Sequence, residues 1–500
     1  MIKVIASEVV KLDSNVNTGG GTDVTEKLQG ILDLAPKNGG LHLIMDGAAL
    51  VSGLKVHSDT TIECINRDCG FFMKDNANRN LITNYNADYK NINTKNLTFI
   101  NGTYNQNCTK QVQSVTSDEF PNAKNPGRYV SERHFTHLME LEGVENLKIT
   151  DVKFKNQRVY TLSLANFKNV VMENVSVDMA EHVHPSNQDG FHFFGPGRFL
   201  TMKNIRGCTG DDFINFAPDE HDGESSITDI YADGIFFDDV CQGIRMLSRE
   251  NGVLDRVTLR NVVGTYKTFA FSINPFFRGK TYGHYGDIFI ENVDVRQLKE
   301  TYHYTPLSFM GIGGDMDCIT LKNVRFRNPV RNSTFIDLGR PFFYRPKELT
   351  EEEMEKYCIT DFEELGRNAD WMPEGVRKPI IKTFILDNVI FESDEKADDM
   401  NYVELKYNID NFIARNIKLF RGENAKTSGY LIKTANDAKL KNVFLENVYA
   451  EKVESVFYAD KHHEIDFIDA NNVILKQGKN AIDTEKALVK KEIRNSVYDM

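Results

Sequence analysis

A short alternating pattern that ends on Asn or Asp recurs along most of this chain. NLKITDVKF (146–154), DIFIENVDV (287–295) and NVFLENVYA (442–450) are three copies, and in each a β-branched residue follows the polar marker. The markers are Asp151, Asn174, Asn204, Asn261, Asn292, Asn323, Asn388, Asn416 and Asn447. Most successive markers are 23–31 residues apart, and steps of 57 and 65 indicate either two units or one unit with an insertion. The chain is therefore a repeat protein.

Repeats of this length occur in leucine-rich proteins, helical solenoids and parallel β-helices. Each copy alternates with a period of two residues, which is typical of strands and not of helices. Val, Ile and Phe dominate the apolar positions, whereas leucine-rich repeats need Leu at fixed offsets. The sequence therefore predicts an all-β fold, a right-handed parallel β-helix, with about three short strands per coil and coils ~4.8 Å apart. The marker Asn is expected at a bend, bonded to the Asn of the next coil.

The pattern also predicts how the domains are arranged. Residues 1–40 are expected to form an N-terminal cap, with a helix in TDVTEKLQGILDLA (22–35) that begins at Asp23 and Glu26. Residues 41–475 are expected to form the β-helix domain, with insertions at about 105–135 and 340–378. Residues 476–500 look like a polar tail or helix. A capping helix would cover the open end of the coil stack, whose unpaired strand edge would otherwise promote aggregation.

The net charge excludes some classes of partner. A formal charge of -12 at pH 7 argues against nucleic acid or an anionic membrane surface, because both require a basic footprint. The first residues, MIKVIASEVVKLD, lack the apolar run of a signal peptide, so a cytoplasmic protein is expected, or a secreted one if this sequence is a trimmed form. The composition is compatible with a homo-oligomer.

Three acids lie at the two ends of the stretch NQDGFHFFGPGRFLTMKNIRGCTGDD (187–212). Asp189 and Asp211 are 22 residues apart, about one coil, so they are expected on neighbouring coils of one face, with Asp212 adjoining them. Repulsion among three close carboxylates favours one shared proton. Glycoside hydrolysis needs a protonated and an ionised carboxyl around one bond, so this spacing indicates a glycosidase.

The same segment resembles glycoside hydrolase family 28, the polygalacturonase family, or a close pectin-lyase-like β-helix relative. NQDG (187–190) is similar to the family's Asn-Thr-Asp-Gly signature, and GDD (210–212) to its paired-Asp signature. The resemblance spans roughly residues 15–330. It implies an inverting hydrolase of a poly- or oligosaccharide, with Asp211 as general acid and Asp189 and Asp212 activating water. It implies no metal and no organic cofactor.

The sequence also departs from the family pattern. Gln242 in CQGIRMLS (241–248) stands where the family has His, and YKTFAFSINP (266–275) lacks the family's Arg-Ile-Lys, which binds a uronate carboxylate. Loop residues could replace both: a His from a loop beside the acids, and Arg, Lys and Tyr from NPFFRGKTYGHYG (274–286). The predicted substrate-binding residues are Asn187, Gln242, Arg245, His184, His221, Arg278, Lys280 and Tyr282.

Two other functions fit the same residues. In a calcium-dependent polysaccharide lyase on this fold, the three Asp would hold Ca²⁺, and Arg245 would act as the base. A non-catalytic glycan-binding or tail-spike protein would keep the acids without turnover. The sequence does not name the sugar or linkage, nor decide between endo and exo attack.

Overall fold

The computed structural model describes residues 1–111, 136–179, 188–273, 283–298, 308–328, 334–338, 379–393, 400–435, 438–460, 463–484 and 487–500. The expected insertions at about 105–135 and 340–378 lie largely outside these residues. The described residues fall into two compact units, within 1–240 and 241–500. No helix among them is long and apolar enough to cross a membrane.

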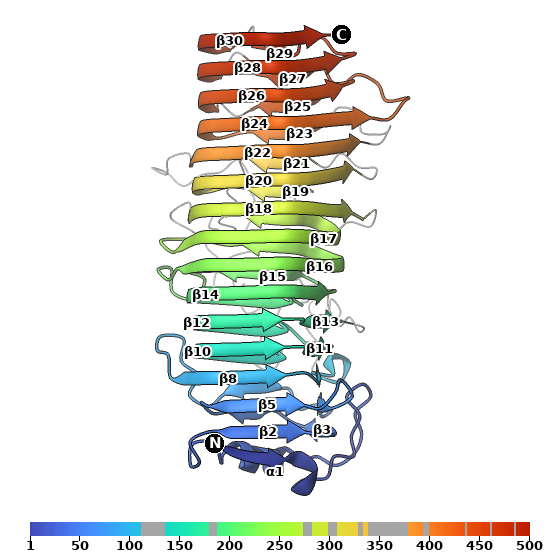
Figure 1. The fold of residues 1–500 in the computed structure, drawn as a ribbon, viewed down its shortest axis with the longest axis vertical. Helices are drawn as coiled ribbons and strands as arrows, with labels where there is room; N and C mark the ends of the chain where they lie inside the picture. The colour runs from blue at the N-terminus through green and yellow to red at the C-terminus, as the bar shows by residue number, and fades with distance from the viewer. Residues whose placement is uncertain are drawn as a thin grey trace, which may run out of the picture. The chain divides into compact units, whose positions relative to one another are not determined.

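The first unit is built from strands and one α-helix (Figure 1). Its elements are β1 (Ile2–Ile5), α1 (Thr25–Leu32), β2 (Leu41–Met45), β3 (Ala48–Val51), β4 (Leu54–Val56), β5 (Thr60–Cys64), β6 (Gly70–Met73), β7 (Ile82–Asn84), β8 (Thr94–Ile100), β9 (Thr103–Asn105), β10 (Met139–Thr150), β11 (Lys153–Lys155), β12 (Leu162–Glu173), β13 (Ser176–Asp178), β14 (Phe191–Gly207), β15 (Asp212–Ala217) and β16 (Ile227–Met246), which continues into the second unit. Two 3-10 turns cover Ala6–Glu8 and Cys108–Lys110.

Strands of successive coils pair in parallel, and their inward side chains form the core. Leu162 in β12 lies opposite Phe191 in β14, which lies opposite Ile214 in β15. Phe191 is fully buried, and its ring lies 6.5 Å from that of Phe154 and 6.1 Å from that of Phe213, so aromatic rings meet edge to face from coil to coil. The predicted right-handed parallel β-helix is confirmed as the fold class, because a strand of one coil can pair in parallel with the next only after a full turn of chain.

The marker residues form the predicted ladder at the bends. The Asn174 side-chain amide donates to Asp151 Oδ1 at 3.0 Å, and that of Asn204 donates to Asn174 Oδ1 at 2.6 Å. All three have a positive φ, between 53° and 60°, a conformation that Asn and Asp tolerate better than other side chains. The bend therefore selects the residue type, and the amide ladder joins the coils.

The two long steps between markers have different causes. Gly234, with φ 75°, lies in register with Asn204, so the 57-residue step includes one coil in which Gly replaces Asn. In the 65-residue step, Val324 pairs directly with Val389, and the Asn388 amide donates to Asn323 Oδ1 at 2.8 Å. That step is a single coil with an insertion.

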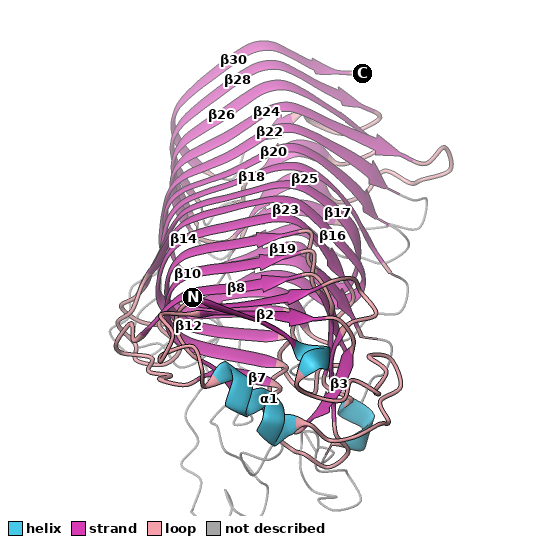
Figure 2. Ribbon diagram, turned by 60° about the horizontal axis from the view of Figure 1, so that its bottom comes forward, coloured by secondary structure: helices cyan, strands magenta, loops and turns pink. Residues whose placement is uncertain are grey.

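The predicted N-terminal helix is confirmed as α1, which lies at the end of the strand stack of the first unit (Figure 2). Its Leu28, Ile31 and Leu32 side chains are buried. Gln29 pairs with the backbone of Lys55 through bonds of 3.0 and 2.8 Å, which join the helix to β4. The helix begins at Thr25 with Val24 as its N-cap and not at Asp23 as predicted; Asp23 instead accepts a hydrogen bond from the Thr25 amide at 3.0 Å from one residue before the cap.

The described residues of the second unit form strands joined by loops and contain no helix. Its elements are β17 (Val253–Ile273), β18 (His284–Gln297), β19 (Ser308–Ile312), β20 (Asp315–Asn328), β21 (Thr334–Leu338), β22 (Ile380–Ser393), β23 (Asn401–Leu405), β24 (Asn408–Arg421), β25 (Tyr430–Thr434), β26 (Lys439–Glu451), β27 (Ser455–Tyr458), β28 (Glu464–Lys476), β29 (Ile482–Asp483) and β30 (Leu488–Asp499).

The prediction of a tail or helix over residues 476–500 is wrong. This segment forms β29 and then β30, which pairs in parallel with β28 from Leu488 to Asp499. Val489, Ile493 and Val497 recur every four residues, a spacing that also suits a helix. The segment forms a strand because it pairs with β28, and the chain bends at Ser496, which has a φ of 55°.

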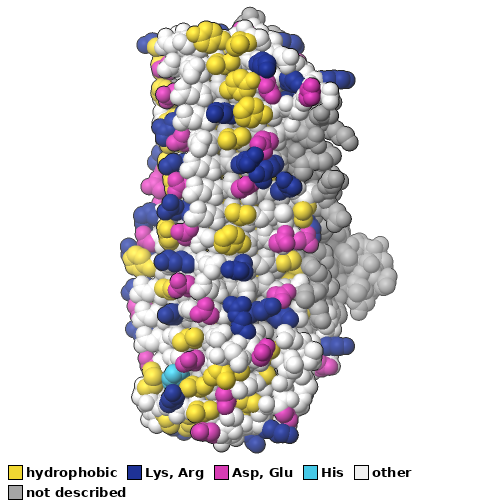
Figure 3. All heavy atoms as spheres, turned by 45° about the vertical axis from the view of Figure 1, so that its right-hand side comes forward, with side chains coloured by type: hydrophobic (Ala, Val, Ile, Leu, Met, Phe, Trp, Pro, Cys, Tyr) yellow, Lys and Arg dark blue, Asp and Glu magenta, His cyan; other side chains and the backbone are white. Residues whose placement is uncertain are grey.

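Charged side chains of both signs lie among hydrophobic ones on the face shown in Figure 3. Ion pairs also join neighbouring coils; Glu145, for example, lies 3.1 Å from the Lys95 ammonium and 3.0 Å from that of Lys168. Such exposed pairs stabilise a protein by only about 0–1 kcal/mol each. The buried strand faces therefore contribute most of the stability of each unit.

Candidate active site

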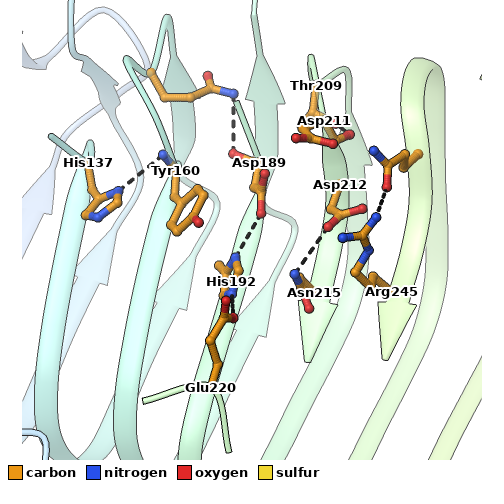
Figure 4. Close-up of polar contacts among 12 residues, drawn as sticks. His137, Tyr160, Asp189, His192, Thr209, Asp211, Asp212, Asn215, Glu220 and Arg245 are labelled. Carbon is orange, nitrogen blue, oxygen red and sulfur yellow. Dashed lines mark hydrogen bonds and ion pairs between the residues drawn. The ribbon is translucent and has the colours of Figure 1, made fainter. Parts of the chain in front are cut away.

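The three acids predicted from the sequence come together in the first unit. Asp189 lies just before β14, Asp211 lies just before β15, and Asp212 is the first residue of β15 (Figure 4). One carboxylate oxygen of each residue lies within 4.8 Å of the others. The expectation that acids one coil apart meet on one face is confirmed.

The pairing register between β14 and β15 explains why the three acids meet. Phe191 pairs with Ile214, so Asp189 and Asp212, each two residues earlier, occupy matching positions on adjacent coils. The Gly190 amide donates to the Asp212 carbonyl oxygen at 2.9 Å, which continues this register to the acids. The stacked pair is therefore Asp189 and Asp212, and Asp211 reaches the same group from the bend just before β15.

The three acids differ in exposure. Asp189 and Asp212 are each only 3% exposed, whereas Asp211 is half-buried. Asp212 Oδ2 accepts a hydrogen bond from the Asn215 side-chain amide at 3.2 Å. Asp211 is thus the carboxylate of the three with most access from outside.

Asp189 is held by His192, a residue that sequence analysis missed. His192 Nδ1 lies 2.8 Å from Asp189 Oδ2, and its Nε2 lies 3.2 Å from Glu220 Oε2. Burial alone would lower the pKa of the imidazole, but the two carboxylates outweigh burial and raise that pKa to about 9. His192 is therefore a buried cation beside the acids at neutral pH.

Aromatic rings fix the His192 side chain on both faces. The Tyr160 ring stacks on it at 4.4 Å between centroids, and the Phe194 ring at 4.2 Å. His137 in turn stacks on Tyr160 at 4.7 Å. Burial first, then repulsion from His192, lowers the pKa of His137 to about 3, so His137 is neutral where His192 is charged.

Register also forms two columns of residues along this face. Positions that match Asp189 on the preceding coils are Tyr160 and His137, and positions that match His192 are Ser163 and Glu140. Burial, followed by repulsion from Glu142, raises the pKa of Glu140 to about 7. The face beside the three acids thus carries a further carboxyl group and no Lys or Arg in these two columns.

The structure describes three of the eight predicted substrate-binding residues, and they do not all lie near the acids in sequence or in the same unit. His221 lies near the ring cluster, with its centroid 4.2 Å from that of Phe194. Gln242 and Arg245 lie in the second unit, where they are buried and the Arg245 guanidinium donates to Gln242 Oε1. Asn187, His184, Arg278, Lys280 and Tyr282 lie outside the described residues. Their binding roles remain predictions.

Two kinds of chemistry fit the carboxylate group itself. Oxygen atoms as close as these could bind one divalent cation, because Ca²⁺ and Mg²⁺ prefer carboxylate ligands. They could equally share a proton and act as a general acid and a base.

Comparison with known proteins connects this segment to one family. Residues 54–234 match the model of glycosyl hydrolases family 28. A search of curated proteins finds no match. Among solved structures, the family 28 exopolygalacturonase of Yersinia enterocolitica is 14% identical, with 93% of this chain and 78% of that chain covered and a TM-score of 0.46.

Two further structures show the same kind of similarity. The hyperthermoactive exopolygalacturonase of Thermotoga maritima is 12% identical over 95% of this chain and 91% of its own, with a TM-score of 0.45. The tailspike of E. coli bacteriophage HK620, in complex with a pentasaccharide, is 10% identical over 96% of this chain and 77% of its own, with a TM-score of 0.46. The predicted resemblance is confirmed where it bears on the site: residues 54–234, which contain Asp189, Asp211 and Asp212, match glycosyl hydrolase family 28 and fold as a parallel β-helix.

Proposed function

We propose that this protein is a glycoside hydrolase that cleaves a glycosidic bond in a poly- or oligosaccharide. Inversion of configuration is what the match to family 28 implies, since carboxyl groups this close would by spacing alone also suit a retaining enzyme. The observation that carries this proposal is the meeting of Asp189, Asp211 and Asp212 within 4.8 Å, inside the segment that matches family 28. Two carboxyl groups in different protonation states are the minimum that such a reaction requires.

Each acid has a role that suits its surroundings. Asp211, the most exposed of the three, protonates the glycosidic oxygen as the bond to the anomeric carbon breaks. Asp189 and Asp212 accept the proton of the attacking water, whose oxygen bonds to the anomeric carbon from the opposite side. The hydrogen bond from Asn215 and the contact with His192 favour the ionised forms of these two bases.

The substrate is proposed to be a neutral glycan. The two columns beside the acids carry Glu140 and no Lys or Arg, the low pKa of His137 leaves it uncharged, and Asp189 and Glu220 offset the charge of His192. A polyuronate would bring negative charge onto this face and be repelled. The lack of an Arg-x-Lys sequence in residues 266–275 supports the same choice.

The test is a glycan panel, neutral and uronic, incubated with the wild-type protein and with Asp211→Asn. Reducing ends and the ultraviolet absorbance of unsaturated sugars are followed with and without a chelator. New reducing ends without absorbance, lost in Asp211→Asn and unaffected by the chelator, are the expected result. Neutral glycans should be cleaved and uronic ones left intact.

One alternative has a specific observation in its favour. A calcium-dependent polysaccharide lyase would use the same close carboxylate oxygens as ligands. It would give absorbance that requires Ca²⁺, and this result would replace the hydrolase proposal. Binding without any turnover would instead indicate a non-catalytic glycan-binding protein.

A further inference from the structure

We propose that His192 and Glu220 form a positioning pair that orients Asp189 and keeps it ionised, and that this pair does the work of the family histidine that Gln242 replaces. The inference rests on the proposed function, because a positioned base matters only to a catalytic Asp189. It names two residues that neither touch the glycosidic bond nor accept its protons.

The geometry uses both nitrogens of the ring. Nδ1 faces Asp189 Oδ2 at 2.8 Å, and Nε2 faces Glu220 Oε2 at 3.2 Å. An ionised carboxylate only accepts hydrogen bonds, so each nitrogen must carry a proton to bond its partner. The contacts therefore describe an imidazolium between two carboxylates, and charge-assisted bonds of this kind are stronger than neutral ones.

The ring has little freedom to turn. Tyr160 and Phe194 stack on it with interplanar angles of 20° and 24°, and only 3% of His192 is exposed. On β14, His192 lies between Ser163 of one neighbouring strand and Asn215 of the other. A carboxylate bonded to such a rigid donor keeps one orientation, which is what a base that must meet a water molecule needs.

The charges around His192 determine the direction of the pH effect. Asp189 and Glu220 attract the imidazolium, His137 on the far side of Tyr160 is uncharged, and the groups facing the ring from the other strands are the neutral Ser163 and Asn215. The imidazolium stabilises ionised Asp189 in return. If the cation is removed, Asp189 should bind its proton more tightly, and the base should become active only at higher pH.

The first test compares His192→Gln, Glu220→Gln and a matched control, His42→Gln. His42 forms a similar pair with Glu63, at 2.7 Å, in the same unit and away from the acids. His192→Gln should lower kcat by about 100-fold, with a much smaller change in KM. It should also move the acidic limb of the pH profile of kcat/KM upward by about 1–3 pH units.

Glu220→Gln should give the same changes to a smaller degree, and His42→Gln should change neither quantity. Wild-type kcat and an unshifted acidic limb in both site variants would overturn the proposal. A loss of kcat with an unshifted limb would also overturn it, because a merely structural role would have that effect. If thermal unfolding shows that the His192→Gln variant is not folded, the Glu220→Gln variant provides the test.

A second measurement separates this inference from the hydrolase proposal. Imidazole ¹⁵N chemical shifts of His-labelled protein at pH 7, assigned by difference with His192→Gln, report whether both ring nitrogens carry protons. A doubly protonated ring that becomes singly protonated in Asp189→Asn is expected, even if no glycan is cleaved. A neutral ring in the wild-type protein would refute the pair, whatever the protein hydrolyses.

Discussion

Asp189 and Asp212 lie opposite each other on adjacent coils, and the Gly190 amide joins the two coils by donating to the Asp212 carbonyl oxygen at 2.9 Å. The two carboxylates are 23 residues apart in sequence, one full turn of this β-helix. The length of one coil therefore determines that the carboxylates of this candidate site meet. The predictions below test the site and the scaffold that forms it.

The three Asp residues should each be required for turnover. Asp189→Asn, Asp211→Asn and Asp212→Asn preserve side-chain shape but remove the acid or base, so kcat should fall by about 10²–10⁴-fold. Reducing-end assays on the cleaved glycan would measure this fall. Asp229→Asn, which removes an ion pair with Arg198 outside the site, is the control and should keep wild-type activity. Full activity in any site variant would remove that residue from the mechanism.

His192 should make stability depend on pH in alkaline solution. Its pKa is raised in the folded protein from 6.5 to about 9, so the folded state binds the proton more tightly than the unfolded chain. The resulting stabilisation is complete below about pH 6.5 and is lost as pH rises through about 9. Melting temperatures between pH 6 and 10 should therefore fall more steeply for the wild-type protein than for His192→Gln. Parallel curves would contradict the charged state of His192.

Glu140 should also make the folded protein less stable as pH rises, because its ionised form is the unfavourable one. Burial and then Glu142 raise its pKa to about 7, so the folded state favours the protonated acid and loses stability as pH rises from about 4.5 through 7. Glu140→Gln keeps an acceptor for Asn80 and removes the charge. It should raise the melting temperature at pH 8 and change it little at pH 4.5. An equal change at both pH values would show that the charge is not the cause.

Asn174 should be more sensitive to Ala than to Gly. Its φ of 54° costs a residue such as Ala about 1–2 kcal/mol, and loss of the ladder hydrogen bonds adds about 0.5–1.5 kcal/mol each. Gly tolerates the backbone conformation and loses only the bonds. Urea unfolding should therefore rank stability as wild type, then Asn174→Gly, then Asn174→Ala. The reverse order of the two variants would argue against a conformational role for this position.

Much of the scaffold could be predicted because it repeats. The period of two within each copy determines which side chains point inward, and Asn before a β-branched residue marks each bend, since few other side chains accept a positive φ. The C-terminal segment was mispredicted because Val489, Ile493 and Val497 suit a helix as well as a strand. In this segment pairing with the neighbouring strand β28, and not the local sequence pattern, determines the secondary structure.

The sequence by itself determined the coil repeat, the ladder and the meeting of three acids, because each depends on spacing along the chain within one or two coils. Only the tertiary structure decided that Asp212, not Asp211, stacks on Asp189, and that His192 bridges Asp189 and Glu220. Glu220 follows β15 in a turn, and the Gly195 amide joins this turn to the preceding coil by donating to the Pro218 carbonyl oxygen at 3.0 Å. No local periodicity encodes such a contact, because it depends on the register between coils and on how each bend returns the chain to the sheet.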